Sequence, residues 1–246
     1  MVVLIGAAFG IALLAAVGQA VSGFGFALIS VPLLIPLIGA PAAVAAATML
    51  SFLLTLGSSV QQRAHVQWRT VAVVSATAVA GMPFGLLALQ LLAARWLSLV
   101  IGCTVIVMVI VLARRTHGPV RDRPVRDRSV AAAGALSGAL LTSTGMNGPP
   151  LVAALHGMGL APRPFRASLQ AAFVLQDAIA IVGFALVGRV TGQALTAVAA
   201  GIPGLVAGWL LGDLAFGRMK QETFRWIVLA MLTATGTVAL VQAISG

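Results

Sequence analysis

Two short glycine-rich stretches hold the residues of this chain that are best suited to bind a small ligand. The first reads Ser-Gly-Phe-Gly-Phe from Ser22 to Phe26, and the second reads Thr-Gly-Met-Asn-Gly-Pro-Pro from Thr144 to Pro150. Glycine and proline interrupt helices, and an interrupted helix leaves backbone N–H and C=O groups without helical partners. Backbone N–H groups at the start of a helix, together with the positive end of its dipole, favour an anion.

We therefore expect an anionic ligand to be held by these two breaks and by the polar side chains beside them. Hydroxyl and amide groups donate hydrogen bonds to the oxygens of an anion without the strong trapping of a buried arginine. Two alternatives stay open, because glycines also permit close helix packing and Ser or Thr often bond their own backbone. The candidate binding residues are Gln19, Ser22, Gly23, Phe24, Gly25, Phe26, Thr144, Gly145, Met146, Asn147, Gly148 and Pro149.

The elements that must position these residues are membrane helices. The chain has 246 residues, of which 60% are hydrophobic and 8% are charged, and its mean hydropathy is +1.08. A soluble domain carries about 25% charged residues. No charged residue precedes Arg63, and several uncharged runs exceed the roughly 20 apolar residues that a spanning helix needs. The composition therefore predicts an integral membrane protein without a soluble domain.

The excess of positive charge has an ordinary explanation in a membrane protein. Six of the fifteen Lys and Arg residues lie in the segment 114–129, and arginines in short loops hold their side of the membrane in the cytoplasm. Without a folded basic surface, a nucleic-acid partner is not expected. One cysteine and scattered histidines supply no metal site, and no cofactor is expected. The expected partners are a small anionic substrate and membrane lipids, with a homo-oligomer left open.

The hydrophobic segments fall into two halves, 1–113 and 130–246, joined by the basic linker 114–129. Each half begins with a pair of pieces connected at its break and continues with three full spans. If each pair returns to the side from which it entered, nearly all loop arginines lie in the cytoplasm, as the positive-inside rule requires. We thus predict an all-α integral membrane protein made of two inverted repeats, each a broken-helix hairpin plus three transmembrane helices. The expected pieces are 2–21, 24–38, 42–61, 70–92 and 96–113, then 130–144, 149–160, 166–188, 194–215 and 224–244.

Asp177 is the only acid well inside a hydrophobic segment. A charged side chain at a helix centre costs about 2.5–3.5 kcal/mol on insertion scales, so this acid must be protonated, paired or hydrated. Two interpretations stay open: a proton-coupling group, or a structural hydrogen bond to a neighbouring helix. In the first half, Thr48, Ser51, Thr55 and Ser58 share one helical face by their spacing, and we expect that face to avoid lipid.

At the glycine breaks and one loop, the sequence resembles a known family. The residues are Gly23-Phe24-Gly25-Phe26 with Pro32, the loop 64–69 (Ala-His-Val-Gln-Trp-Arg), and the glycine-proline motif of the second half. Their joint order resembles the TauE/SafE family of sulfite and sulfonate exporters over essentially the whole chain.

The resemblance implies a secondary transporter for small sulfur-containing organic or inorganic anions, such as sulfite or sulfonates. Proton coupling is one option for such a carrier. It also implies residence in the inner (plasma) membrane of a bacterium. The alternatives are an uncoupled small-anion channel or a carrier of non-sulfur carboxylates. An enzyme is not expected, because the chain has no phosphate-binding loop and lacks a cluster of acids and histidines.

Overall fold

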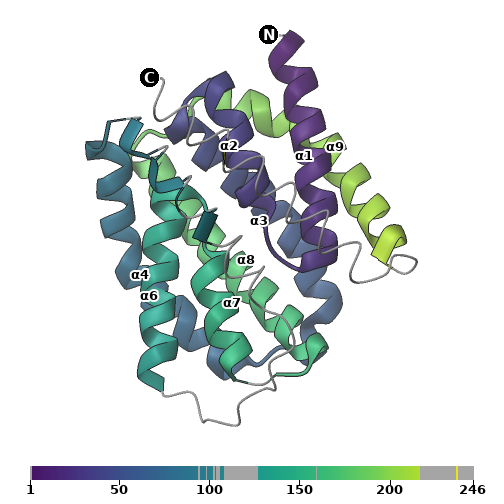
Figure 1. Cartoon of the computed structure of the whole chain (residues 1–246), viewed down its shortest axis with the longest axis vertical. Helices are drawn as coiled ribbons and strands as arrows, with labels where there is room; N and C mark the ends of the chain where they lie inside the picture. The colour runs from purple at the N-terminus through teal and green to yellow at the C-terminus, as the bar shows by residue number, and fades with distance from the viewer. Residues whose placement is uncertain are drawn as a thin grey trace.

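The computed structural model is helical in every element of the part of the chain that it describes, namely residues 2–93, 95–97, 99–101, 103, 106–107, 127–158, 160–216 and 237. The predicted all-α class is therefore confirmed. Figure 1 shows the helices α1 (Val2–Ser22), α2 (Phe26–Ile38), α3 (Ala40–Gln62), α4 (Trp68–Leu91), α6 (Asp127–Thr144), α7 (Gly148–Gly157), α8 (Pro162–Leu186) and α9 (Gly192–Phe216), with a 3-10 turn η1 (Arg63–His65).

Most helix boundaries lie close to the predicted ones. Helix α6 begins at Asp127, inside the predicted linker, and α8 begins at Pro162, four residues before the predicted start. Proline fits the first turn of a helix because the N–H that it lacks would have no helical partner there. The rest of the linker and all of the piece 224–244 except residue 237 lie outside the described residues. The division into two repeats and a cytoplasmic linker stays a prediction.

Five of the described helices are long and apolar enough to cross a bilayer, namely α1, α3, α4, α8 and α9. Helices α2 and α7 have 13 and 10 residues, so at 1.5 Å per residue they are about 20 and 15 Å long. Neither crosses a hydrocarbon core of about 30 Å. Large apolar side chains such as Phe84 and Leu186 are exposed on the outside of the bundle, as expected for a surface that contacts lipid. The chain is a membrane protein.

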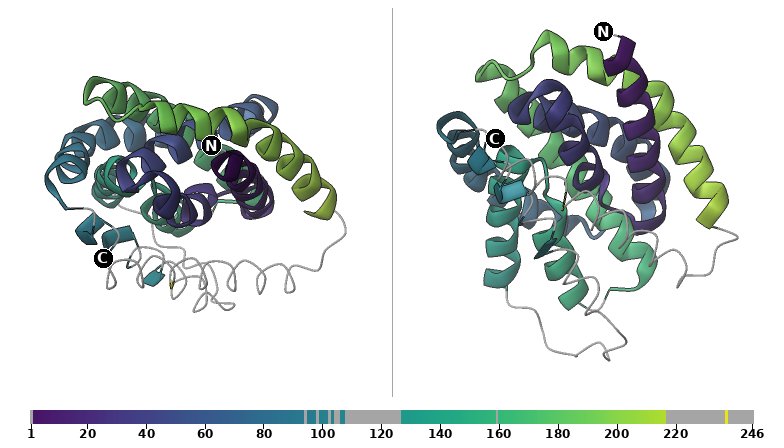
Figure 2. Two further views of the ribbon diagram at one scale, coloured as in Figure 1. Left: turned by 90° about the horizontal axis from the view of Figure 1, so that it is seen from above. Right: turned by 45° about the horizontal axis from the view of Figure 1, so that its top comes forward.

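The helices of the two halves pair crosswise. Helix α1 packs along α9, α4 packs along α6, and α3 packs against α8; both views of Figure 2 show α1 beside α9. Small residues make this approach close. A methyl group on Gly204 would meet the Phe9 carbonyl of α1, and one on Gly81 would meet the Ala135 carbonyl of α6. Such contacts between small residues are a common way to join membrane helices.

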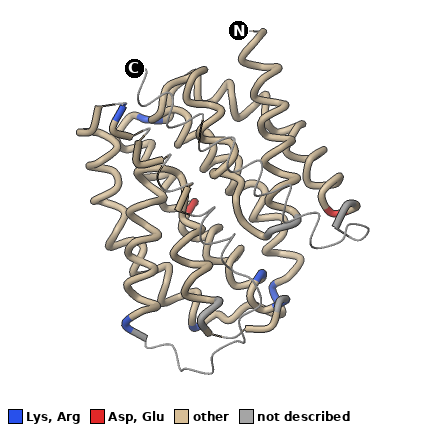
Figure 3. The backbone as a smooth tube through the Cα atoms, in the orientation of Figure 1, with Lys and Arg blue, Asp and Glu red and all other residues tan. Residues whose placement is uncertain are grey.

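The first helices of the two halves, α1 and α6, run in opposite directions. In Figure 1, α1 descends from the upper end of the bundle, whereas α6 rises from the lower end. Each crosswise pair joins an element of one half to an element of the other half. An inverted repeat would produce this pairing, and the inverted repeat itself stays a prediction. In Figure 3 the described Lys and Arg positions lie at the upper end and in the lower part of the bundle, and an acidic position lies near its middle.

The contact between α1 and α9 is tight enough to test with a single methyl group. Gly204→Ala is expected to lower the midpoint of thermal unfolding in detergent, because overpacking typically costs about 1–3 kcal/mol. Gly10→Ala is the matched control on α1, since nothing lies within 4 Å of the added methyl group there. It should leave the midpoint unchanged or raise it, because alanine is the better helix former by about 1 kcal/mol. Equal losses in both variants would contradict the packing.

Candidate functional site

The first break is held together by the side chain of Gln19. Gly23 and Gly25 have φ values of 79° and 109°, in the left-handed region that favours glycine, and they turn the chain between α1 and α2. The N–H of Gly23 donates to the carbonyl of Gln19 at 2.8 Å. The N–H of Phe26, the first residue of α2, donates to Gln19 Oε1 at 3.0 Å. The predicted helix-end N–H at Phe26 therefore has a partner within the protein.

The second break has the same opening geometry. Gly145 has a φ of 77° and donates its N–H to the carbonyl of Leu141 at 2.8 Å. Helix α7 then starts at Gly148, with Pro149 and Pro150 in its first turn, where prolines fit. The hydroxyl of Thr144 donates to the Leu140 carbonyl at 2.7 Å. Thr144 thus bonds the backbone of its own helix, which is the alternative to a binding role that the sequence left open.

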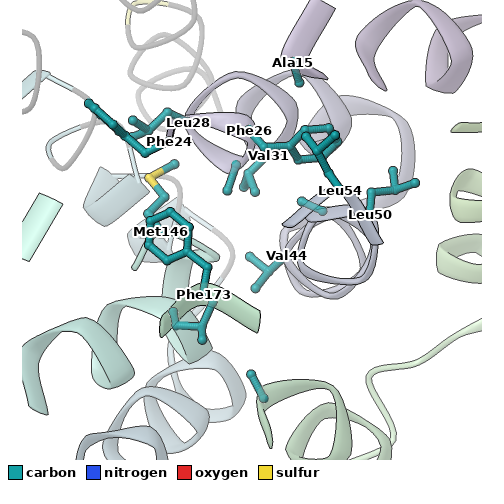
Figure 4. Close-up of a cluster of buried hydrophobic side chains, with 14 of the residues drawn as sticks. Ala15, Phe24, Phe26, Leu28, Val31, Val44, Leu50, Leu54, Met146 and Phe173 are labelled. Atoms are coloured by element: carbon teal, nitrogen blue, oxygen red, sulfur yellow. The ribbon is translucent and has the colours of Figure 1, made fainter. Parts of the chain in front are cut away.

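The two breaks meet inside the bundle. A methyl group on Gly148 would lie 3.5 Å from the ring of Phe24, so the start of α7 faces the turn before α2. Figure 4 shows Phe24, Met146 and Phe173 gathered beside this meeting point. A cavity of about 20 Å³ lies there, enough for about one water molecule. Its lining comes from both halves and consists of Gln19, Gly25, Phe26, Ala27, Leu28, Ser51, Met146, Asn147, Gly148 and Phe173.

A buried polar network joins the second break to α8. Asn147 Nδ2 donates to Asp177 Oδ1 at 3.2 Å, and the Ser51 hydroxyl of α3 lies close to the same carboxyl. Ser137 lies 3.1 Å from the carbonyl of Asn147 and donates to Gln176 Oε1 at 2.8 Å. Asp177 is only 1% exposed. The structure therefore places the buried acid one hydrogen bond away from a residue that lines the cavity.

Three polar atoms near the cavity have no hydrogen-bond partner within the described structure. They are Gln19 Nε2, Gln176 Nε2 and Asp177 Oδ2. Buried polar atoms without a partner are uncommon, because each costs about 1–3 kcal/mol. The Gln19 nitrogen is the informative one, because its oxygen must face the N–H of Phe26. The two N–H donors of Gln19 Nε2 therefore point away from the bond between Gln19 Oε1 and the N–H of Phe26.

The structure collects most of the predicted site residues at one place, and their role in binding stays a prediction. Six of them line the cavity, Gly23 and Gly145 form the two turns, and Phe24 faces Gly148. The hydroxyl of Thr144 bonds its own helix, and Pro149 lines a separate, larger cavity beside α6 and α7. The side chain of Ser22 lies outside the description. The lining residues from the predicted set are Gln19, Gly25, Phe26, Met146, Asn147 and Gly148.

Sequence reasoning left four lining residues out of this site, namely Ala27, Leu28, Ser51 and Phe173, and it also missed the nearby Ser137. Ser51 belongs to the predicted hydroxyl face of α3, whose four members are buried, so that face avoids lipid as expected. Phe173 lies one helical turn before Asp177, a spacing that places both on one face. Ser137 had no local signal, because its partners are ten and 39 residues away in the sequence.

A larger cavity does not suit an anion. About 680 Å³ of space lies beside α6 and α7, lined almost entirely by apolar groups that include Trp96, Cys103 and Leu140. An anion needs several donors to replace its water, and an apolar wall offers none. The small cavity between the breaks is therefore the better candidate site.

Comparison with known proteins agrees with this architecture. The family model described as sulfite exporter TauE/SafE matches residues 8–239. The chain belongs to the TauE/SafE family. A relative from Cupriavidus necator, described as a probable sulfite/organosulfonate exporter TauE, is 26% identical over 238 residues, covering 92% of this chain and 90% of the relative. No solved structure matches the chain. As a member of the TauE/SafE family, the chain is a membrane transporter and not an enzyme.

The glycines of the second break should differ in their tolerance of a side chain. Gly145→Ala is expected to lower thermal stability and to reduce transport, because a left-handed conformation costs a non-glycine residue about 1–2 kcal/mol and the methyl group would lie 3.1 Å from Val31. Gly148→Ala is the control, since Gly148 is helical and its nearest contact would be an ordinary 3.5 Å. Both are measured by thermal unfolding and by flux in vesicles. Gly148→Ala being the more damaging would refute this reading of the turn.

Proposed function

We propose that the protein is a secondary transporter that moves small sulfur-containing anions, such as sulfite or sulfonates, across the cytoplasmic membrane. The observation that carries this proposal is the meeting of two helix breaks at one buried cavity with amide side chains in its wall. Paired breaks near the middle of the membrane are where secondary transporters bind their substrates. The printed description of the Cupriavidus necator relative names sulfite and organosulfonates, which supports this substrate class.

The wall chemistry fits a weakly held oxyanion with an apolar part. Gln19 and Asn147 contribute neutral amide donors, and no residue that lines the cavity carries a positive charge. Amides bind sulfonate oxygens without the strength of an arginine pair, so release stays fast. Phe24, Met146 and Phe173 lie close together (Figure 4), and Met146 and Phe173 line the cavity, so they suit the carbon part of a sulfonate.

The size of the cavity favours a carrier over an uncoupled channel. About 20 Å³ holds about one water molecule and no sulfonate, so the site must widen to admit substrate. A channel needs a path open to both sides, whereas alternating access opens a closed site to one side at a time. We therefore place the described conformation between the two open states of a carrier.

Asp177 is our candidate for proton coupling. An ionised carboxylate one residue away from the cavity would repel an anion, and protonation would remove that repulsion. It would also weaken the pull of Asp177 on the amide of Asn147, which could then donate to substrate. Proton and anion would in this way favour each other's binding, as reciprocal coupling requires.

We infer the orientation in the membrane from the arginines. The turn η1 packs against the start of α8, where the N–H of Gln67 donates to Ser168 at 2.8 Å. We call this region the η1 end; it brings together Arg63, Arg69 and Arg163. Positive residues in short loops mark the cytoplasmic side, so we propose that the η1 end and the linker 114–129 face the cytoplasm.

The role of Gln19 is tested by exchanging its amide for a carboxyl group of the same shape. Gln19→Glu keeps an oxygen for the N–H of Phe26 but loses the donors and adds negative charge, so sulfonate transport is expected to fall at least tenfold, about 1.4 kcal/mol. Lowering the pH should restore part of it, because a protonated carboxyl group regains one donor. Gln62→Glu, outside the cavity, is the control. Unchanged transport by Gln19→Glu would remove the binding role.

The coupling role of Asp177 is tested by its pH profile. Transport of methanesulfonate, whose charge is constant from acid to neutral pH, is expected to rise as the pH falls, because more Asp177 is protonated. Asp177→Asn keeps the side-chain shape without a titrating group, so its transport should be independent of pH. Stopped-flow measurement of internal pH should also show no proton movement. A pH profile identical to that of the wild type would end the proposal for Asp177 and leave the binding site untouched.

A further inference from the structure

Arg166 joins the second half of the chain to the break of the first half. It lies on α8, one turn from the start of that helix, and its guanidinium donates to the carbonyl of Ala20 at 2.8 Å. Its stem covers the turn, since a methyl group on Gly23 would lie 3.3 Å from Arg166 Cγ. Ala20 belongs to the last turn of α1, where carbonyls lack helical partners and the dipole is negative. A cation is favourable there.

The matching position of the other half is apolar. Gly145 has nearly the same backbone angle as Gly23, 77° against 79°. The neighbours of a methyl group on Gly145 would be Val31 at 3.1 Å and Val44 of α3 at 3.8 Å. Helices α3 and α8 are the third elements of their halves and pack together. The two breaks therefore share a geometry, but among the described residues a cation covers only the first one.

Arg166 also lies close to the cavity. Ala20 follows Gln19 directly, so the guanidinium is bonded to the residue next to a lining residue. The side chain is half-buried and sits at the η1 end, and Asp213 of α9 acts on it electrostatically. A guanidinium presents its N–H donors in a planar fork that matches the oxygens of an oxyanion.

We propose that Arg166 is an anion-binding station on the η1 side of the site and the latch that holds the first break closed. The inference rests on the proposed transport function and adds its sidedness. An oxyanion arriving from the η1 end binds the guanidinium and competes with the carbonyl of Ala20 and with Asp213. Weakening of that bond frees the turn at Gly23 to move away from α8, which opens the cavity on this side. The apolar cover of Gly145 gives the opposite side no such station.

The experiment measures transport of methanesulfonate from each side, in vesicles where the protein has one orientation. Arg166→Gln is expected to raise KM about tenfold for anion offered at the η1 face, a loss typical of electrostatic attraction in a cleft, and to change KM at the other face much less. Raising the ionic strength should weaken wild-type entry at the η1 face more than it weakens entry in the variant. Arg163→Gln is the matched control, because it removes the same charge from the first turn of the same helix at an exposed position. Its KM values should stay close to those of the wild type.

Other results overturn the inference. Equal effects of the two substitutions would mean a general surface charge, and an equal rise in KM at both faces would mean a role without sidedness. An effect of Arg166→Gln only in vesicles with anionic phosphatidylglycerol, and none in pure phosphatidylcholine, would assign the arginine to lipid headgroups. Arg166→Lys, which keeps the charge but loses the fork, is the second variant if Arg166→Gln does not fold. It should show a smaller rise at the η1 face, and no rise would refute the station. Absence of sulfonate transport by the wild type would instead overturn the proposed function itself.

Discussion

Every part of this structure depends on one constraint, which is that backbone polar groups inside a membrane must find partners in the protein. The breaks expose such groups at depth. At the first break, the carbonyl and the side-chain oxygen of Gln19 accept hydrogen bonds from backbone N–H groups. At the second break, the carbonyl of Leu141 accepts a backbone N–H and the hydroxyl of Ser137 donates to a backbone carbonyl. These partners serve only while lipid is kept away, and the crosswise helix pairs provide that enclosure. The helix breaks can therefore exist inside the membrane only because small residues let the helices pack closely and exclude lipid.

The sequence predicted the local features well, because local chemistry determines them. Two glycines in three residues, or a glycine followed directly by two prolines, weaken a helix strongly, so both breaks and the short helices α2 and α7 were predictable. The looser pairs that contain Pro83 and Pro203 stay inside α4 and α9. The hydroxyl face of α3 followed from its spacing. The pairing of α1 with α9 was not predicted, because Gly204, Gly208 and Gly212 indicate close packing without naming the partner. The contact between Arg166 and Ala20 joins residues 146 positions apart, and no local sequence pattern at either residue indicates it.

The two halves share a frame but differ in chemistry. Both third helices, α3 and α8, carry polar side chains toward the middle of the bundle, but α3 brings hydroxyl groups whereas α8 brings Gln176 and Asp177. The amides at the breaks differ in the same way, since Gln19 is bonded to backbone and Asn147 is bonded to an acid. The two halves thus carry different side chains at corresponding places. In this chain, the titrating group belongs to one half and the guanidinium beside the first break comes from α8 of that same half.

The pairing of α1 with α9 has a consequence for how the protein is made. About 170 residues separate the end of α1 from the start of α9, which is about 10–30 seconds of synthesis at common ribosomal rates. During that interval α1 and its turn are already emerging, while the helix that covers them does not yet exist. Because lipid cannot pair with backbone polar groups, the insertion machinery or a temporary protein neighbour must shelter the glycine turn until then. Helix α1 is therefore synthesised first but completes its packing late. Quality-control proteases of the membrane would encounter it unpacked during that interval.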